Sequence, residues 1–124
     1  MGKNIYLWLA LGWTAMIAIL CLAGSGDVPG VKMYQADKFV HFAFYFAFTI
    51  FWFKYFMARM PQIKFSALLL RMLLFASAYG IAIEVFQMLF TTTRHADVDD
   101  VLANISGAVV AAMVLALAFR RNAK

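Results

Sequence analysis

The sequence predicts an all-α membrane protein with four transmembrane helices and both termini in the cytoplasm. Its composition supports this class, because 65% of the residues are hydrophobic and only 14% are charged, whereas a soluble domain carries about 25% charged residues. The apolar residues also fall into four long runs, each of about the length that crosses a bilayer. Closed β-barrels are the other structures that span membranes. Their strands appear in a sequence as short segments of alternating polar and apolar residues, whereas these runs are long and continuously apolar.

The predicted helices form one transmembrane domain over residues 1–124. They cover about residues 5–23, 38–57, 65–90 and 100–119. The first run follows a short basic N-terminus, so a cleaved signal peptide is the alternative interpretation of it. We favour a retained helix, because the run is long for a signal-peptide core and contains Tyr6, Trp8 and Trp13. Pro61 breaks the chain between the second and third runs.

The distribution of charge predicts the orientation. The basic residues before the first helix, around the second turn and at the C-terminus are Lys3, Lys54, Arg59, Lys64, Arg71, Arg120, Arg121 and Lys124. With four spans these regions share one side, which the positive-inside rule assigns to the cytoplasm. The acidic residues fall on the opposite side, and they are Asp27, Asp37, Glu84, Asp97, Asp99 and Asp100. The net charge of +5 therefore reflects orientation, and no aromatic-basic pattern indicates a nucleic-acid partner.

Polar residues recur at helical spacing near the outer ends of three predicted helices. They are Asp37, Lys38 and His41 in the second helix, Glu84 and Gln87 in the third, and Asp97, Asp100 and Asn104 in the fourth, with Arg94 before it. Ionisable groups at membrane depth are costly, and they indicate a functional site by default. We expect the three stripes to converge on one extracytoplasmic polar site.

Two structural interpretations remain open beside a functional one. Asp97 or Asp99 fits the N-cap of the fourth helix, where Asp is favoured. The whole polar set also fits an interhelical network of hydrogen bonds and ion pairs, with Arg94 paired to Glu84 or to an aspartate. Gly107 and the alanines after it predict close helix packing through small residues, and Tyr45 fits an anchor at the membrane interface.

The polar residues resemble the VanZ-like family in their order and spacing. The matching motifs are Asp37-Lys38-x-x-His41, Glu84-x-x-Gln87 and Arg94-x-x-Asp97-x-x-Asp100-Val101-Leu102-Ala103-Asn104-x-x-Gly107, within residues 37–118. The resemblance implies a small, multi-pass protein of the bacterial inner (cytoplasmic) membrane. The namesake of the family is linked to low-level teicoplanin resistance, and the family has no generally accepted reaction. Thr91, Thr92, Thr93 and Ala111 depart from the family pattern, which affects the loop and the packing but not the polar set.

The expected function is binding of an anionic lipid headgroup or a lipid-linked wall precursor on the extracytoplasmic face. The expected ligand-binding residues are Asp37, Lys38, His41, Glu84, Gln87, Arg94, Asp97, Asp100 and Asn104. Lys38 and Arg94 would contact phosphate, because arginine is suited to bidentate contact with it. The sequence specifies no oligomeric state.

An enzyme acting on a lipid-linked phosphate is the alternative function. Its catalytic candidates are His41, Glu84 and Asp100, with His41 or Glu84 as general acid or base. We assign no resident metal or other cofactor, because the sequence contains no paired-cysteine or HExxH motif. A divalent-metal form of the enzyme would use these three residues together with Asp97, and a carboxylate-rich set suits Mg²⁺ or Mn²⁺ better than Zn²⁺. A nucleophile motif and a Gly-rich phosphate loop are also absent from the sequence.

Overall fold

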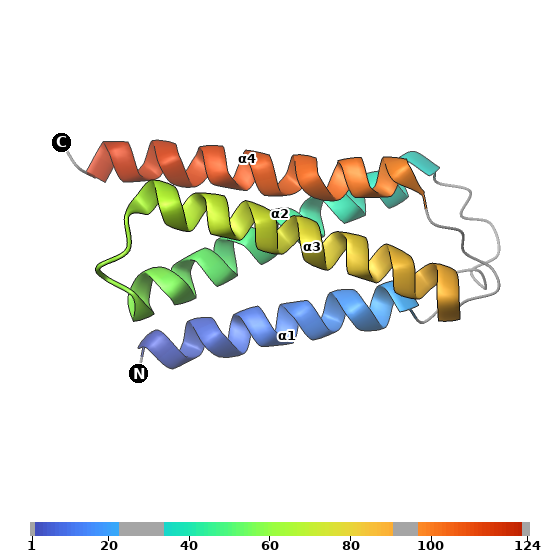
Figure 1. The fold of residues 1–124 in the computed structure, drawn as a ribbon, viewed down its shortest axis with the longest axis horizontal. Helices are drawn as coiled ribbons and strands as arrows, with labels where there is room; N and C mark the ends of the chain where they lie inside the picture. Colours follow the sequence, from blue (N-terminus) through green and yellow to red (C-terminus); the bar gives the residue numbers. More distant parts are fainter. Residues whose placement is uncertain (1, 23–33, 91–96, 123–124) are drawn as a thin grey trace.

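The computed structural model, which describes residues 2–22, 34–90 and 97–122, contains four α-helices (Figure 1). They are α1 (Gly2–Leu22), α2 (Tyr34–Arg59), α3 (Phe65–Phe90) and α4 (Val98–Asn122). The described residues include no strand. Each helix is long and apolar enough to cross a membrane, which confirms the prediction of an all-helical protein with four spans.

The helices differ from the apolar runs mainly at their ends. α3 covers the predicted range, whereas α2 begins at Tyr34 and α4 at Val98, both earlier than expected. The apolar pattern misses these first turns because they are polar, and a helix continues as long as its backbone groups find partners. The polar residues in the first turn of α2 are therefore part of the helix.

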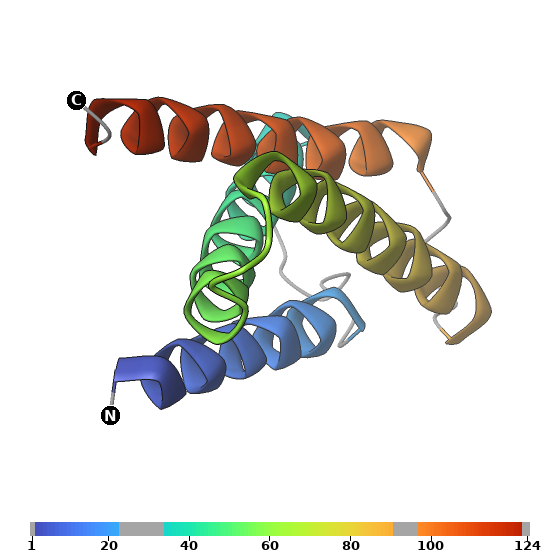
Figure 2. The same ribbon diagram turned by 60° about the vertical axis from the view of Figure 1, so that its left-hand side comes forward.

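α2 and α3 lie between α1 on one side and α4 on the other, as the two views in Figures 1 and 2 show. The most extensive contact joins α2 to α4. The start of α1 and the end of α4 lie at the same end of the bundle as the turn between α2 and α3 (Figure 1). The starts of α2 and α4 and the end of α3 therefore meet at the other end.

The turn between α2 and α3 follows from its sequence. The backbone N–H of Ile63 donates to the carbonyl of Met60 at 3.1 Å, which places Pro61 at the second position of a β-turn, where its fixed φ is favoured. The next helix starts at once, with Leu68 N–H donating to the carbonyl of Lys64 at 3.0 Å. This short connection holds α2 and α3 antiparallel.

The surface of the bundle is apolar and part of its interior is polar. Trp8, Phe39 and Leu117 are 71%, 72% and 64% exposed, whereas His41 and Glu84 are 2% and 3% exposed. A soluble monomer rarely exposes so much contiguous apolar surface, but lipid covers such a surface in a membrane. The distribution therefore agrees with a multi-pass membrane protein.

Small residues bring α4 close to α2. Gly107 is buried beside Ala108 and Ala111, and a Cβ on Gly107 would overlap the backbone carbonyl oxygen of Phe42. Only glycine permits this approach, because any side chain would displace the backbone of α2. The predicted packing through small residues is confirmed, and it fixes the distance between the two helices that carry most of the polar groups.

α1 is joined to the bundle by a group of hydrogen bonds around Thr14, which we call the Thr14 node (Ala10, Thr14, Trp52 and Tyr79). The Thr14 hydroxyl donates to the carbonyl of Ala10 at 2.7 Å and accepts from Trp52 Nε1 at 3.0 Å. The Tyr79 hydroxyl donates to the Thr14 carbonyl at 2.6 Å. These uncharged groups link α1 to α2 and α3 within the apolar part of the bundle.

Candidate functional site

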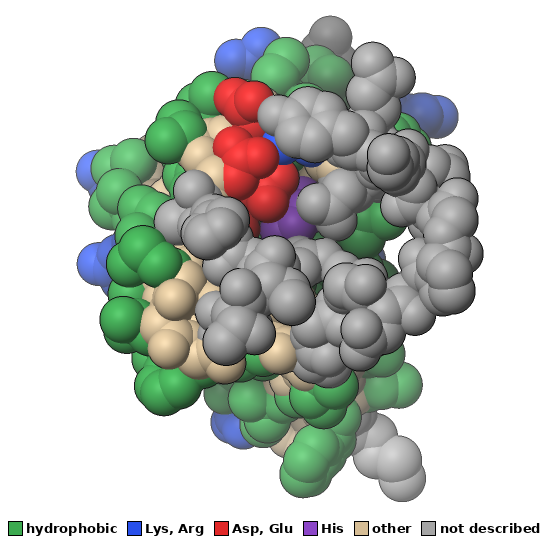
Figure 3. Space-filling view, turned by 90° about the vertical axis from the view of Figure 1, so that its right-hand side faces the viewer, with side chains coloured by type: hydrophobic (Ala, Val, Ile, Leu, Met, Phe, Trp, Pro, Cys, Tyr) green, Lys and Arg blue, Asp and Glu red, His purple; other side chains and the backbone are tan. Residues whose placement is uncertain are grey.

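Six of the predicted site residues lie together at the end of the bundle where α2 and α4 begin and α3 ends. We call this group the polar cluster, and it consists of Lys38, His41, Glu84, Asp97, Asp100 and Asn104. Figure 3 views this end, where acidic side chains, a basic one and a histidine lie close together next to apolar side chains. Three helices contribute to the cluster.

Asp97 caps α4 at the edge of the cluster. Its Oδ1 accepts from the backbone N–H of Asp99 at 2.9 Å, and its carbonyl accepts from the N–H of Asp100 at 3.1 Å. This is the N-cap arrangement expected of an aspartate before a helix. The N–H of Asp99, followed by the ammonium of Lys38, lowers the pKa of the Asp97 carboxyl. Asp97 therefore remains ionised, and the capping interpretation is confirmed for it.

Lys38 joins α2 to α4 through two aspartates. Its Nζ lies 2.9 Å from Asp100 Oδ1 and 3.2 Å from Asp97 Oδ2. The side chains of Lys38 and Asp97 are 22% and 37% exposed, but that of Asp100 is only 10% exposed. The cluster therefore has an accessible rim, formed by Lys38 and Asp97, and a buried base.

His41 and Asn104 form part of the base. His41 Nδ1 lies 3.0 Å from Asn104 Oδ1. An amide oxygen only accepts hydrogen bonds, so Nδ1 carries the proton and donates. In a neutral ring His41 Nε2 then carries the lone pair. It lies 3.8 Å from Asp100 Oδ2, which is too far for a hydrogen bond.

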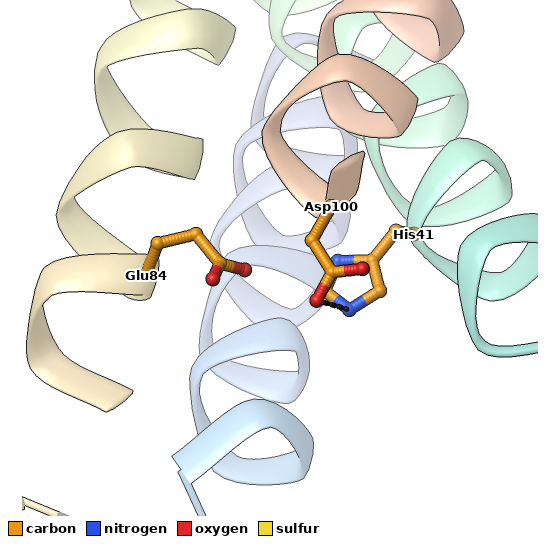
Figure 4. Close-up of side chains that lie close together, drawn as sticks. All are labelled: His41, Glu84 and Asp100. Atoms are coloured by element: carbon orange, nitrogen blue, oxygen red, sulfur yellow. Dashed lines mark ion pairs between the residues drawn. The ribbon is translucent and has the colours of Figure 1, made fainter. Parts of the chain in front are cut away.

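Glu84 approaches the base from α3. Its Oε2 accepts from the backbone N–H of Asp97 at 3.3 Å. In Figure 4 its carboxylate points toward Asp100 and His41. Nitrogen and oxygen atoms of these three side chains lie within 4.8 Å of one another. The three residues that the sequence suggests for acid–base chemistry therefore face one another at the base of the cluster.

Three buried polar atoms near the base have no hydrogen-bond partner among the residues that the structure describes. They are Glu84 Oε1, Asn104 Nδ2 and the Tyr45 hydroxyl. A Cβ built on Gly80 would lie 3.0 Å from Asn104 Nδ2 and 3.3 Å from Tyr45 Cε1, so the glycine leaves room beside these groups. Buried polar groups in native proteins are nearly always paired, so these three atoms are positioned to contact a water molecule, an ion or a ligand.

The remaining predicted site residues lie elsewhere or outside the described residues. Gln87 is buried, but its Nε2 donates to the carbonyl of Cys21 at 2.8 Å, so its amide contacts α1. Asp37 lies in the first turn of α2, and its side chain falls outside the described part of the chain. Arg94 lies outside the described residues as well, with its predicted pairing to Glu84.

Tyr45 and Gly80 also border the base of the cluster. Tyr45 is 0% exposed, so the interpretation of it as an interface anchor is wrong. Its spacing of four residues from His41 predicts that it shares the polar stripe of α2 with that histidine, and its burial agrees with this prediction. The sequence did not predict that Gly80 lies beside these groups, because no sequence pattern shows which side chains of other helices a glycine in an apolar helix contacts.

The fold and the polar cluster define a class: a small multi-pass α-helical membrane protein with ionisable groups buried at one end. The chain also matches the VanZ/LLP1 family model over residues 3–119. It belongs to that family, as the resemblance of its motifs predicted. No curated protein and no solved structure matches the chain.

Proposed function

We propose that this VanZ-like protein of the cell envelope binds a phosphate-bearing lipid headgroup or a lipid-linked wall precursor at the polar cluster. The observation that carries this proposal is the gradient of exposure within the cluster. Lys38 and Asp97 at the rim are partly exposed, whereas His41, Glu84 and Asp100 behind them are buried. A site that is open at one end and closed at the other suits a headgroup that enters from the membrane surface.

The chemistry of the rim and the base suits different parts of such a ligand. Lys38 provides a cation for phosphate at the rim, and we expect Arg94 to add a second one. Glu84, Asp100 and Asn104 offer oxygens for the hydroxyl and amide groups of a precursor. A ligand that combines a phosphate with sugar or peptide groups therefore uses the cluster better than a simple anion does.

The lipid chain of such a ligand has apolar surface available beside the cluster. Phe39 adjoins Lys38 on α2, Val98 adjoins Asp97 on α4, and they are 72% and 73% exposed. Phe90, at the end of α3, is 75% exposed. An amphiphile with its headgroup in the cluster would place its chain along these side chains.

We infer that the cluster faces the extracytoplasmic side of a bacterial inner membrane. Lys54, Arg59 and Lys64 lie around the α2–α3 turn, and Arg120 and Arg121 end α4, all at the opposite end from the cluster. The positive-inside rule favours the cytoplasm for that end. Labelling of single cysteines placed at residues 62 and 99 in intact cells tests this. Labelling of position 99 alone by an impermeant reagent is expected, and labelling of position 62 alone would reverse the orientation.

Binding is tested with purified protein in nanodiscs of neutral lipid that contain a fluorescent polyprenyl phosphate. Lys38→Ala is expected to weaken binding by about tenfold or more, because a charge-assisted contact contributes about 1.5–3 kcal/mol. Lys54→Ala is the matched control, since it removes the same charge from the other end of α2. Equal binding by the wild type and Lys38→Ala would contradict the proposed site.

The family link suggests an effect on glycopeptide susceptibility, which we propose as the cellular consequence. Teicoplanin carries a fatty chain, so competition at the membrane surface gives a physical route. In a strain in which deletion of the gene changes teicoplanin susceptibility, Arg94→Ala is expected to reproduce the deletion while the protein remains inserted. Full complementation by Arg94→Ala would exclude this role for the arginine.

Acid–base catalysis on a lipid-linked phosphate is a second candidate function. It is favoured by the mutual approach of the His41, Glu84 and Asp100 side chains at the base (Figure 4). In this mechanism His41 Nε2 accepts a proton and Lys38 stabilises the developing phosphate charge. Turnover of polyprenyl phosphates or pyrophosphates by the wild type, and its loss in His41→Gln, would establish an enzyme. Binding without turnover leaves the binding function.

A further inference from the structure

We propose that His41, Glu84 and Asp100 form a binding site for a divalent transition-metal ion. Each residue contributes one ligand atom, and these atoms lie within 4.8 Å of one another. Ligands ~2.1 Å from a tetrahedral metal ion lie ~3.4 Å apart, so small side-chain rotations bring the three atoms to ligand spacing. Figure 4 shows the carboxylate of Glu84 on one side of the gap and Asp100 with His41 on the other.

The histidine has the orientation of a metal ligand. Its Nδ1–H donates to Asn104 Oδ1 at 3.0 Å, and its Nε2 is directed toward Asp100. Metal-bound histidines almost always donate their second ring N–H to an oxygen of the protein, which fixes the tautomer and the direction of the lone pair. Asn104, itself 1% exposed, performs that function here.

Glu84 provides a second observation, independent of the histidine, that points to a bound ion. The residue is 3% exposed, and its Oε1 has no hydrogen-bond partner within residues 2–22, 34–90 and 97–122. The other oxygen of the carboxylate is held by the backbone N–H of Asp97, which fixes the orientation of the group. A buried carboxylate oxygen that points at another carboxylate and a histidine is costly unless a cation or a proton lies between them.

The described part of the cluster carries more acidic than basic groups. Glu84, Asp97 and Asp100 are three acidic groups, whereas Lys38 is the one lysine or arginine that contacts them among the described residues. Asp100 Oδ1 is bonded to Lys38, which leaves Oδ2 directed at the histidine. A divalent ion between the three ligands would offset this excess of negative charge, which the proposed contribution of Arg94 would reduce by one.

The ligand set indicates the class of metal. One imidazole nitrogen and two carboxylate oxygens suit Mn²⁺, Fe²⁺ or Zn²⁺, whereas Mg²⁺ and Ca²⁺ prefer oxygen ligands alone. The set differs from the sequence-based one, because the Asp97 carboxylate bonds Lys38 and the N–H of Asp99. Three protein ligands also leave coordination positions for an outside oxygen, so the ion could bridge the cluster to a phosphate, a role that rests on the proposed function.

The test measures Mn²⁺ alone, in nanodiscs of phosphatidylcholine without anionic lipid, so that it is independent of headgroup binding. Electron paramagnetic resonance of free Mn²⁺ follows the titration. We expect saturable binding to the wild type, at least ~10-fold weaker binding to Glu84→Gln, and no change for Asp99→Asn, which neutralises the exposed neighbour of Asp100. Excess Mg²⁺ is expected to displace Mn²⁺ poorly.

A second measurement on the wild type covers the case in which Glu84→Gln does not fold. Electron spin echo spectra of bound Mn²⁺ should show coupling to an imidazole nitrogen, and ¹⁵N-labelled histidine should change that coupling. Saturable binding without nitrogen coupling would place the ion away from His41 and overturn the proposed site. The proposal would also be overturned by no saturable binding up to millimolar Mn²⁺, since the carboxylates then share a proton instead.

Discussion

The Thr14 node and the polar cluster both join three helices through polar side chains, but they differ in how completely their groups are paired. In the node, the Thr14 hydroxyl, Trp52 Nε1 and the Tyr79 hydroxyl all have partners at 2.6–3.0 Å. In the cluster, Glu84 Oε1 and Asn104 Nδ2 are buried without a partner in the described part of the chain. Polar groups cross between helices in both regions, so polarity alone does not distinguish them.

This difference in hydrogen-bond pairing distinguishes a structural role from a binding role. Paired, uncharged groups between membrane helices each add a modest stabilisation of about 0.6 kcal/mol on average. Buried ionisable groups in a membrane protein are costly, and they persist where they serve a function. We therefore interpret the node as structural and the cluster as a binding site, and three substitutions test this division.

The largest effect is expected from Gly107→Ala, which affects the contact that supports the cluster. The new Cβ would overlap the carbonyl oxygen of Phe42, so α2 and α4 must separate. We expect a loss of about 2 kcal/mol or more in the free energy of unfolding, together with weaker Mn²⁺ binding. Reversible denaturation in detergent measures the first, and the Mn²⁺ titration measures the second.

Gly12→Ala is the matched control for that substitution. A Cβ on Gly12 meets nothing within 4 Å, and alanine favours a helix more than glycine does. The control should therefore keep the full stability and full Mn²⁺ binding. If both glycine variants behaved alike, close packing of α4 on α2 would not be what holds the cluster together.

Asn104→Leu should have the next largest effect, and it acts on binding. The substitution removes the acceptor that orients His41 and also removes the unpaired Nδ2. We expect Mn²⁺ affinity to fall by about 10–100-fold. The free energy of unfolding should change little, because the loss of the acceptor for His41 Nδ1–H and the removal of the unpaired Nδ2 have opposite effects. A purely structural network would show lost stability with no change in binding.

The smallest effect is expected from Thr14→Val in the node. The change keeps the shape of the side chain and leaves Trp52 Nε1 without its acceptor. We expect the free energy of unfolding to fall by about 1 kcal/mol, with the Mn²⁺ titration unchanged. A Thr14→Val protein with impaired binding would show that the two regions are coupled and would remove the basis of the comparison.

The sequence predicted the helices and the end of the bundle at which the polar residues lie, but it did not predict the arrangement within the cluster. Long apolar runs directly indicate membrane-spanning helices. Polar residues spaced three or four positions apart indicate that their side chains share one face of a helix. Glu84 and Gln87 show where such spacing stops being informative. They are one turn apart, yet Glu84 faces Asp97 while Gln87 faces Cys21, because adjoining positions of one face meet different neighbouring helices.

The Thr14 node illustrates a second kind of information that the sequence does not carry. A single threonine within an apolar run has no periodic pattern, and its partners Trp52 and Tyr79 lie far along the chain. The approach of His41, Glu84 and Asp100 likewise depends on distances between three helices, which Gly107 and its contact with Phe42 help to set. The binding roles of these residues remain predictions.

The most direct test is anomalous X-ray scattering from crystals of the protein grown in lipid and soaked in Mn²⁺. We predict a peak between the three side chains, ~2.1–2.3 Å from His41 Nε2 and from one carboxylate oxygen each of Glu84 and Asp100. Well-ordered density with no such peak, and with Glu84 Oε1 hydrogen-bonded to Tyr45, to Asn104 or to water, would contradict the account and identify the cluster as an internal network.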